Sequence, residues 1–232
     1  MGGLTEFGAD VIKECNRLGI LVDLTHASAD TVAAALKAST KPVVFSHTGL
    51  DTRLGNNGSM GQMMRPRLIS KEHAKTIADA GGVVGVWTHL VDSAAEYVQA
   101  VRDMVDVVGI DHVCIGTDTK LTQGNNPGGF GGPRGGPNRG PDVGPNGGQP
   151  GGGPGGFGGP DGGRRGPGQG GPGGGRGRGG GRTNQAWADQ KLGFYYAVVA
   201  QMVNQGFAAE QIGKVGGGNF CRVFDAATAG HM

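Results

Sequence analysis

Four short apolar runs alternate with segments of helical spacing, and this alternation constrains the fold more than any other feature of the chain. The runs lie at 20–24, 42–46, 83–87 and 112–117. They are almost continuously apolar, which is typical of parallel strands that are covered on both faces. Because single helices are expected between the runs, the sequence predicts repeated βα units and an α/β fold.

The expected helices have recognisable starts and stops. Hydroxyl residues that can cap a helix stand before several of them, and Gly19 and Gly81 stand where two of them end. The segment 48–66, rich in Gly, Asn and Met, is expected to form a loop. The expected helices are 5–18, 28–38, 70–80, 93–109, 187–204, 208–214 and 219–227.

A tract at 123–182 holds most of the 51 glycines of this 232-residue chain. It is rich in Gly and Pro without the strict three-residue period of collagen, so we expect it to be disordered. Its arginines outnumber its acidic residues by five, whereas the whole chain has a formal net charge of +2. The remaining residues are therefore slightly acidic, and their charge does not indicate a nucleic-acid-binding domain.

Two interpretations of this tract stay open. The segments "GRGRGGGR" and "GGFGG" are similar to RGG-type segments, which bind RNA through arginine charge and aromatic stacking. However, only Phe130 and Phe157 bring aromatic rings into the glycine-rich sequence. A long surface insertion costs little stability, because the entropy of loop closure grows slowly with length. We favour a tolerated low-complexity insertion over RNA binding.

Cysteine spacing and hydropathy argue against several classes of protein. Cys15, Cys114 and Cys221 have no metal-type spacing, and we expect reduced, buried thiols. No apolar run has the length of a membrane span. The first ten residues contain no apolar core of a signal peptide, and the sequence sets no expectation about localisation.

Polar residues follow each expected strand. His26, His47, His89 and Asp118 come after the first, second, third and fourth strand in turn. The carboxyl ends of parallel strands meet at one edge of a sheet, where α/β enzymes carry their reactive groups. A single histidine there would suggest only a bond to a backbone carbonyl. Two imidazoles with a carboxylate are a ligand set for zinc or a similar divalent ion.

Several segments, in order along the chain, resemble the C-terminal part of the membrane (renal-type) dipeptidases, zinc peptidases of the amidohydrolase-like barrel group. The resemblance covers nearly all of the chain outside the Gly/Pro tract and is more specific than any one motif. The segments are "GLTEFGADVIKECNRLGILVDLTHAS", "KPVVFSHTGL", "RPRLISKEHAKTIADAGGVVGVW", "MVDVVGIDHVCIGTD" and "IGKVGGGNFCRVF".

The resemblance implies a metal site. His26 matches the family's "DLSH"-like strand end, and His47 matches its "SH(S/T)" strand end. In the family these two histidines hold one zinc ion of a binuclear pair. Asp118 matches the aspartate that binds the other zinc and handles the proton of the bridging hydroxide. The resemblance therefore implies Zn²⁺ as the cofactor and His26, His47 and Asp118 as ligands.

The resemblance also implies substrate contacts. Arg67 in "RPRLIS" matches best the arginine that binds the substrate carboxylate, with Arg65 as an alternative one step away. The planar fork of an arginine pairs bidentately with a carboxylate. His89 stands where some members have a substrate-contacting tyrosine. An exposed loop histidine without a role is an equally good interpretation of His89.

Some family features are absent. The chain contains no His-x-Asp sequence, and neither Glu14, Glu72 nor Glu96 follows a strand as the metal-bridging glutamate would. The last strand continues as "DTKL", where the family commonly has Asp-Phe-Asp-Gly. We therefore expect four C-terminal βα units of a partial (β/α)8 TIM-type barrel, in residues 1–122 and the C-terminal helices of 183–232. Two strand edges would then be open, so the missing N-terminal half or a second copy is expected to complete them.

Three hypotheses about function follow. The first is a zinc-dependent dipeptidase that hydrolyses short peptides with a metal-bound hydroxide, present as a truncated and weakly active or inactive form. The second is a non-catalytic half-barrel that serves as an interaction module, since several family ligands are missing. The third is RNA binding through 123–182, which we place last.

Overall fold

The computed structural model describes residues 2–118, 187 and 192–229. These residues belong to one compact unit, built from 1–124 and 181–232. The Gly/Pro-rich tract at 123–182 lies outside the described residues. Its expected disorder, its RNA binding and the three domain boundaries therefore stay predictions.

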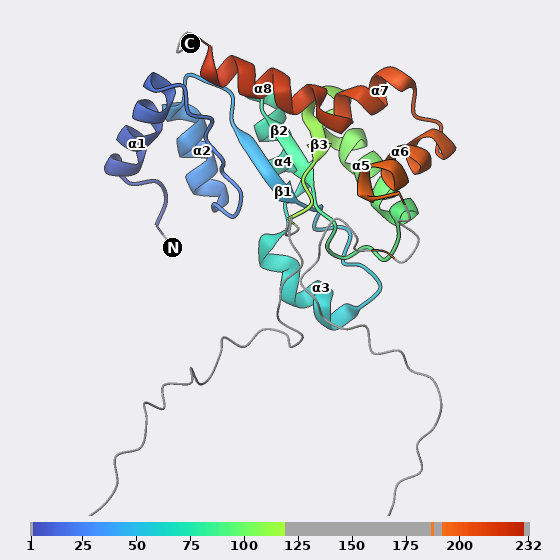
Figure 1. Ribbon diagram of the computed structural model, residues 1–232. Helices are drawn as coiled ribbons and strands as arrows, with labels where there is room; N and C mark the ends of the chain where they lie inside the picture. Colours follow the sequence, from blue (N-terminus) through green and yellow to red (C-terminus); the bar gives the residue numbers. More distant parts are fainter. Residues whose placement is uncertain (1, 119–186, 188–191, 230–232) are drawn as a thin grey trace, which may run out of the picture. The chain divides into compact units, whose positions relative to one another are not determined.

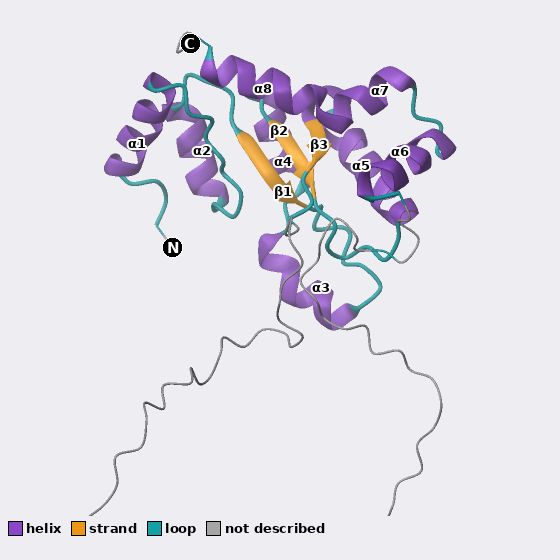
Figure 2. Cartoon of the chain, in the orientation of Figure 1, coloured by secondary structure: helices purple, strands orange, loops and turns teal. Residues whose placement is uncertain are grey.

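Three parallel strands form the centre of the described unit (Figure 2). They are β1 (Val44–Thr48), β2 (Val83–Val86) and β3 (Val113–Ile115), and their order in the sheet is β1-β2-β3. Val84 pairs with Phe45 of β1 and with Val113 of β3. The α/β class with a parallel sheet is thus confirmed.

Four helices before the tract begin at hydroxyl caps, as expected. Ser70 accepts a hydrogen bond from the N–H of His73, and Ser93 accepts one from Glu96. Each such cap satisfies an amide that the first helical turn leaves without a partner. Thr5 and Ser28 cap their helices in the same way. The four helices are α1 (Glu6–Arg17), α2 (Ala29–Ala38), α4 (Lys71–Asp79) and α5 (Ala94–Val108).

The prediction of a full strand at 20–24 is wrong. The structure has there a single parallel bridge, between Asp23 and Val44. Val44 donates its N–H to Val22 and accepts from Leu24. The ladder ends after one bridge because the side chain of Asp23 takes over hydrogen bonds that a longer ladder would make with backbone groups.

The segment 48–66, expected as a loop, contains a short helix. Asn57 caps α3 (Gly58–Met64) by accepting from the N–H of Met60, and the 3₁₀ turn η1 (Arg65–Arg67) follows directly. Pro66 occupies an early position of this turn, where a missing N–H costs nothing. The turn matters because it carries Arg67.

After the tract, the described residues form three helices and a π-helical turn. They are α6 (Phe194–Asn204), α7 (Ala209–Gly213), η3 (Lys214–Gly218) and α8 (Asn219–Thr228). The first begins later than the expected residue 187, after Gly193 with φ 99°. Trp187 packs against Phe194, with ring centroids 5.5 Å apart.

Helix α8 packs on β2 and β3, at the end of the sheet away from α3 (Figure 1). The fully buried Val223 contacts a small apolar cluster of the strands, which contains Val44, Val83 and Cys114. Asn219, 3% exposed, donates to the carbonyl oxygens of Ile110 and Val113 at 2.7 and 2.8 Å. The opposite, carboxyl end of the strands is left for polar side chains.

Candidate metal and substrate site

Four side chains that follow strands in the sequence meet at the carboxyl end of the sheet. His26 Nε2 lies 3.1 Å from His47 Nε2. His47 Nε2 lies 3.7 Å from Asp118 Oδ1, and Asp118 Oδ2 lies 2.8 Å from His89 Nε2. The expectation that these residues share one edge of the sheet therefore agrees with the geometry.

A tight turn positions His26. Oδ1 of Asp23 accepts a hydrogen bond from the N–H of Thr25 at 2.9 Å, which forms an Asx turn at the end of the bridge. His26 itself has φ 66°, a left-handed conformation that is uncommon for residues with a side chain. Ser28 then caps α2, so the imidazole stands in the short connection between bridge and helix.

A β-bulge positions His47. Residues Phe45–Thr48 span three steps of β1 against two steps of β2, so one extra residue is present next to His47. The carbonyl oxygen of Ser46 lies where a β-carbon on Gly85 or on Gly116 would stand. Bulges change the direction of a side chain relative to a regular strand. The two glycines leave room for the bulge that carries His47.

A hydrogen-bond network joins the two ligand segments. Thr25 Oγ1 lies 2.6 Å from Asp23 Oδ1 and accepts from the N–H of Ser46 at 2.7 Å. Ser46 Oγ lies 2.9 Å from Nδ1 of His47. Burial alone would raise the pKa of Asp23, but the hydrogen bonds from Ser46 and Thr25 outweigh it and lower that pKa. Asp23 is therefore an ionised acceptor at neutral pH.

His89 contacts Asp118 directly. The 2.8 Å contact between them is accompanied by an edge-to-face contact of His89 with Trp87, whose ring centroid is 4.8 Å away. Asp118 has φ 50°, so it too adopts a left-handed backbone conformation. The geometry gives His89 a neighbour at the site, whereas its expected contact with substrate stays a prediction.

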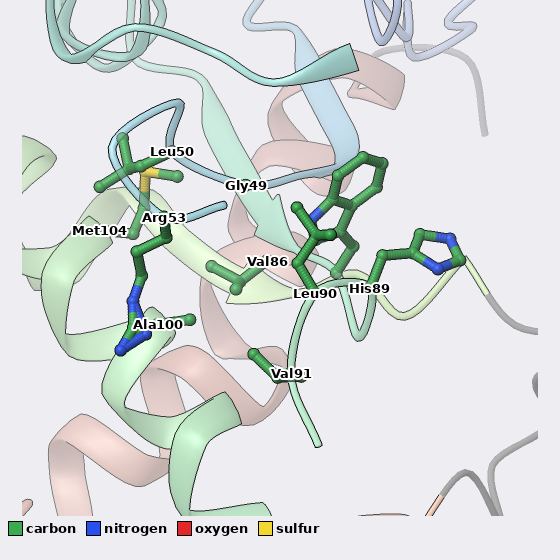
Figure 3. Close-up of a pocket in the computed structure, with 10 residues that line it drawn as sticks. Gly49, Leu50, Arg53, Val86, His89, Leu90, Val91, Ala100 and Met104 are labelled. Carbon is green, nitrogen blue, oxygen red and sulfur yellow. The ribbon is translucent and has the colours of Figure 1, made fainter. Parts of the chain in front are cut away.

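A small cavity lies beside the residues that follow β2. Its volume of about 20 Å³ is close to the space of one water molecule. Figure 3 shows Met104 and Arg53 at this cavity, and the ring of His89 pointing away from them. A dipeptide does not fit there.

A larger pocket of about 170 Å³ lies beside His26. Arg67 and His73 line it together with His26, whereas Arg65 does not. Thr48 Oγ1 donates to the carbonyl oxygen of Arg67 at 3.0 Å, which ties the 3₁₀ turn to the end of β1. Of the two arginines considered from the sequence, Arg67 is the one placed beside a candidate ligand.

Burial lowers the pKa of His26, and the charges of His47 and Arg67 lower it further. A lowered pKa keeps this imidazole neutral at physiological pH. The neutral form has the lone pair that a metal ligand needs.

The histidine pair fits one zinc ion. Two ligands at a typical zinc–nitrogen distance of about 2.0–2.1 Å and a tetrahedral angle stand about 3.3 Å apart, close to the Nε2–Nε2 distance of 3.1 Å. Across residues 2–118, 187 and 192–229, no set of three or more His, Cys, Asp or Glu side chains has the arrangement of a metal site. The pair and Asp118 are thus a partial donor set.

Sequence reasoning missed the roles of Asp23, Thr25 and Ser46. A signal was available, because a hydroxyl residue directly precedes each candidate ligand, in Thr25–His26 and in Ser46–His47. A metal-binding histidine commonly donates its second ring N–H to a nearby acceptor, which orients the ring. The pairing across 21 residues was not visible without coordinates.

A parallel α/β sheet with imidazoles and a carboxylate at its carboxyl edge is the arrangement typical of metal-dependent hydrolases. A family model described as membrane dipeptidase, peptidase family M19, matches residues 1–133. The chain belongs to this membrane dipeptidase family, as the sequence resemblance predicted.

Solved structures show the same fold. An amidohydrolase from Pseudomonas aeruginosa is 22% identical with a TM-score of 0.62, and the match covers 97% of this chain and 58% of that one. A metallo peptidase from Rhodobacter sphaeroides, liganded with a phosphinate mimic of the dipeptide L-Ala-D-Ala, is 18% identical with a TM-score of 0.59. That match covers 98% of this chain and 48% of that one. The chain spans about half the length of these proteins.

Among the helices of the described ranges, none combines the length and the hydropathy of a segment that crosses a bilayer.

Proposed function

We propose that this chain supplies one zinc-binding histidine pair and one further carboxylate of a dipeptidase site. The observation that carries the proposal is the 3.1 Å contact between His26 Nε2 and His47 Nε2, with Asp118 beside them. A zinc ion held there would lower the pKa of water and polarise the carbonyl of a peptide bond. The fold is proposed to be four βα units of a (β/α)8 barrel, of which three strands and the Asp23–Val44 bridge are described.

The protein's own side chains would divide the remaining tasks. Arg67, at the pocket that His26 also lines, would bind the C-terminal carboxylate of a short peptide. Asp118 would bind the second metal and accept a proton, and its contact with His89 would hold the carboxylate in place. His89 would also border the bound peptide.

Zinc binding by the purified full chain tests this proposal. We expect the His26→Ala, His47→Ala double variant to lose the bound zinc, measured by elemental analysis after gel filtration and by titration calorimetry. His112→Ala is the matched control, because the Nδ1 of that histidine contacts the carbonyl of Gly82 instead of the site. Equal zinc content in the double variant and the unsubstituted chain would refute the proposal.

A non-catalytic half-barrel is the second candidate function. It is favoured by the absence of a His-x-Asp sequence and by the partial donor set. We expect this chain by itself to hydrolyse dipeptides little or not at all. Chelator-sensitive hydrolysis by the purified chain would rule out the non-catalytic alternative.

We also propose that the open sheet is completed by a second copy or by a barrel half of the N-terminal type. Large apolar side chains on the helices support this, including Phe7 at 78% exposed and Phe224 at 46% exposed. Sedimentation equilibrium measures self-association directly. A monomer that stays stable and monodisperse at high concentration would contradict both forms of this proposal.

A further inference from the structure

Each hydrogen bond in the network that ends on His47 has a definite donor and acceptor. Together they select one tautomer of that histidine. A neutral imidazole carries one proton, on either Nδ1 or Nε2. The partner of one nitrogen decides which nitrogen is left with a lone pair. The hydrogens can be assigned along the network from its ionised end.

Asp23 is the ionised end of the network. An ionised carboxylate can only accept, so the hydroxyl of Thr25, 2.6 Å from Oδ1, must donate to it. This is the single hydroxyl proton that Thr25 has. Its oxygen is therefore left to accept, which agrees with the bond from the N–H of Ser46 at 2.7 Å.

The hydroxyl of Ser46 is the next group in the network. Its oxygen lies 3.2 Å from Oγ1 of Thr25. The Thr25 proton is already directed to Asp23, and a Ser46 proton directed to His47 would leave lone pairs of the two hydroxyl oxygens facing each other at 3.2 Å. Ser46 is therefore the donor in this contact. The Ser46 proton thus points toward Thr25 and Asp23, away from His47.

Ser46 Oγ can then only accept from Nδ1 of His47, 2.9 Å away. We propose that Asp23, Thr25 and Ser46 are positioning residues that hold His47 as the Nδ1–H tautomer and present its Nε2 lone pair to a metal ion. This inference rests on the proposed zinc site. It adds three residues that touch neither the metal nor the substrate.

The same assignment explains the contact between the two imidazoles. With a lone pair on Nε2 of His47, the 3.1 Å contact is a hydrogen bond only if His26 donates from its own Nε2. In the metal-free chain His26 therefore carries its proton on Nε2. Zinc binding requires this proton to leave Nε2, so the two histidines are expected in opposite tautomers before zinc and in the same tautomer after it.

Two-bond ¹⁵N–¹H NMR of the metal-free full chain, labelled at its six histidines, tests the assignment. The measurement is made at about pH 8, above the ordinary histidine pKa of about 6.5. The His47 signals are identified by their loss in His47→Asn. We expect Nδ1 of His47 to be the protonated nitrogen in the unsubstituted chain.

Substitutions that remove or keep each hydroxyl distinguish an effect of the hydrogen bonds on the tautomer from an effect of side-chain packing. Ser46→Ala and Thr25→Val should shift His47 toward the Nε2–H tautomer and weaken zinc binding about 10- to 100-fold. Ser46→Thr and Thr25→Ser keep the hydroxyls and should restore the tautomer and most of the zinc affinity. Circular dichroism of each variant checks that it is folded.

The possible results distinguish this inference from the proposed function. An Nε2–H tautomer of His47 in the unsubstituted chain, or a tautomer unchanged in folded Ser46→Ala, would overturn the network. The Nδ1–H tautomer in a chain that binds no zinc would support the network and refute the proposed zinc site. The Nδ1–H tautomer together with weakened zinc binding in Ser46→Ala would support both.

Discussion

At the scale of single residues, two candidate ligands stand in unfavourable backbone conformations. His26 has φ 66° and Asp118 has φ 50°. A residue with a β-carbon costs on the order of 1–2 kcal/mol in this region. Such conformations concentrate at functional sites, where the surrounding structure enforces them. These candidate ligand positions are therefore expected to reduce the stability of the protein.

Substitution of His26 by glycine or alanine tests this expectation. Both changes remove the imidazole, but glycine adopts a positive φ without the steric cost. We expect His26→Gly to be more stable than His26→Ala by about 1 kcal/mol in urea unfolding. The control is the exposed helical Ala33, where the change to glycine should destabilise by about 1 kcal/mol. An equal or higher stability of His26→Ala would contradict the strain.

His73 should make stability depend on pH. Burial lowers its pKa, and within the described part of the chain its Nε2 is buried without a hydrogen-bond partner. Because the folded pKa lies below the unfolded value of about 6.5, its contribution is present above that pH. It is lost as the pH falls through the folded pKa. We expect His73→Leu to flatten the pH dependence of the unfolding free energy below about pH 6.5, and an unchanged slope would exclude this source.

At the scale of the elements, the bulge in β1 depends on two glycines, Gly85 of β2 and Gly116, which directly follows β3. A β-carbon on Gly116 would overlap the carbonyl oxygen of Ser46, and the same holds for Gly85. Both glycines are thus part of the support of His47, although neither has a side chain at the site.

Alanine substitutions can measure this support. We expect Gly116→Ala to destabilise the protein by about 1–3 kcal/mol, the usual cost of overpacking, and to weaken zinc binding. Gly213→Ala is the control, because this helical glycine has φ −61° and no atom within 4 Å of an added β-carbon. It should leave stability unchanged or raise it slightly. Equal melting temperatures for the two variants would contradict the role of the bulge.

Three of the four strands, the helices with hydroxyl caps and the polar carboxyl edge of the sheet were predictable from sequence, because apolar runs, caps and the edge rule for parallel strands are local signals. The short helix α3, capped by Asn57 within the expected loop, was missed. The edge rule brought His26, His47 and Asp118 together before any coordinates. The reduction of the expected strand at 20–24 to a single bridge was not predictable. The apolar run does not show that the Asp23 side chain takes over backbone hydrogen bonds of the ladder. The bulge and the path from Asp23 to Ser46 were also hidden, because both depend on distances between residues more than 20 positions apart.

At the scale of the whole molecule, the unit is assembled from two stretches that the tract separates. Helix α5 packs on α6, and β3 packs on η3. The guanidinium of Arg102 lies 4.3 Å from the ring centroid of Phe207 and also binds the carbonyl oxygen of Gln205. The residues after the tract therefore belong to the same core as the residues before it.

Replacement of 123–182 by a Gly/Ser linker of equal length tests the prediction that the tract is a tolerated insertion. Closure entropy depends mainly on length, so the melting temperature and the zinc affinity should stay the same. If RNA binding resides in the arginines of the tract, it should disappear in this variant and weaken with salt in the unsubstituted chain. A melting temperature lowered by several degrees would show that the tract contributes to the fold.

The contact of Val223 with Val44, Val83 and Cys114 has a consequence for biosynthesis. These strand residues leave the ribosome about 100 to 180 residues before α8, which covers them in the folded protein. At translation rates of about 5–20 residues per second, the apolar amino end of the sheet is exposed for roughly 5–35 s. The nascent chain therefore presents a site for chaperones during that interval, and a slower passage through the glycine codons would lengthen it.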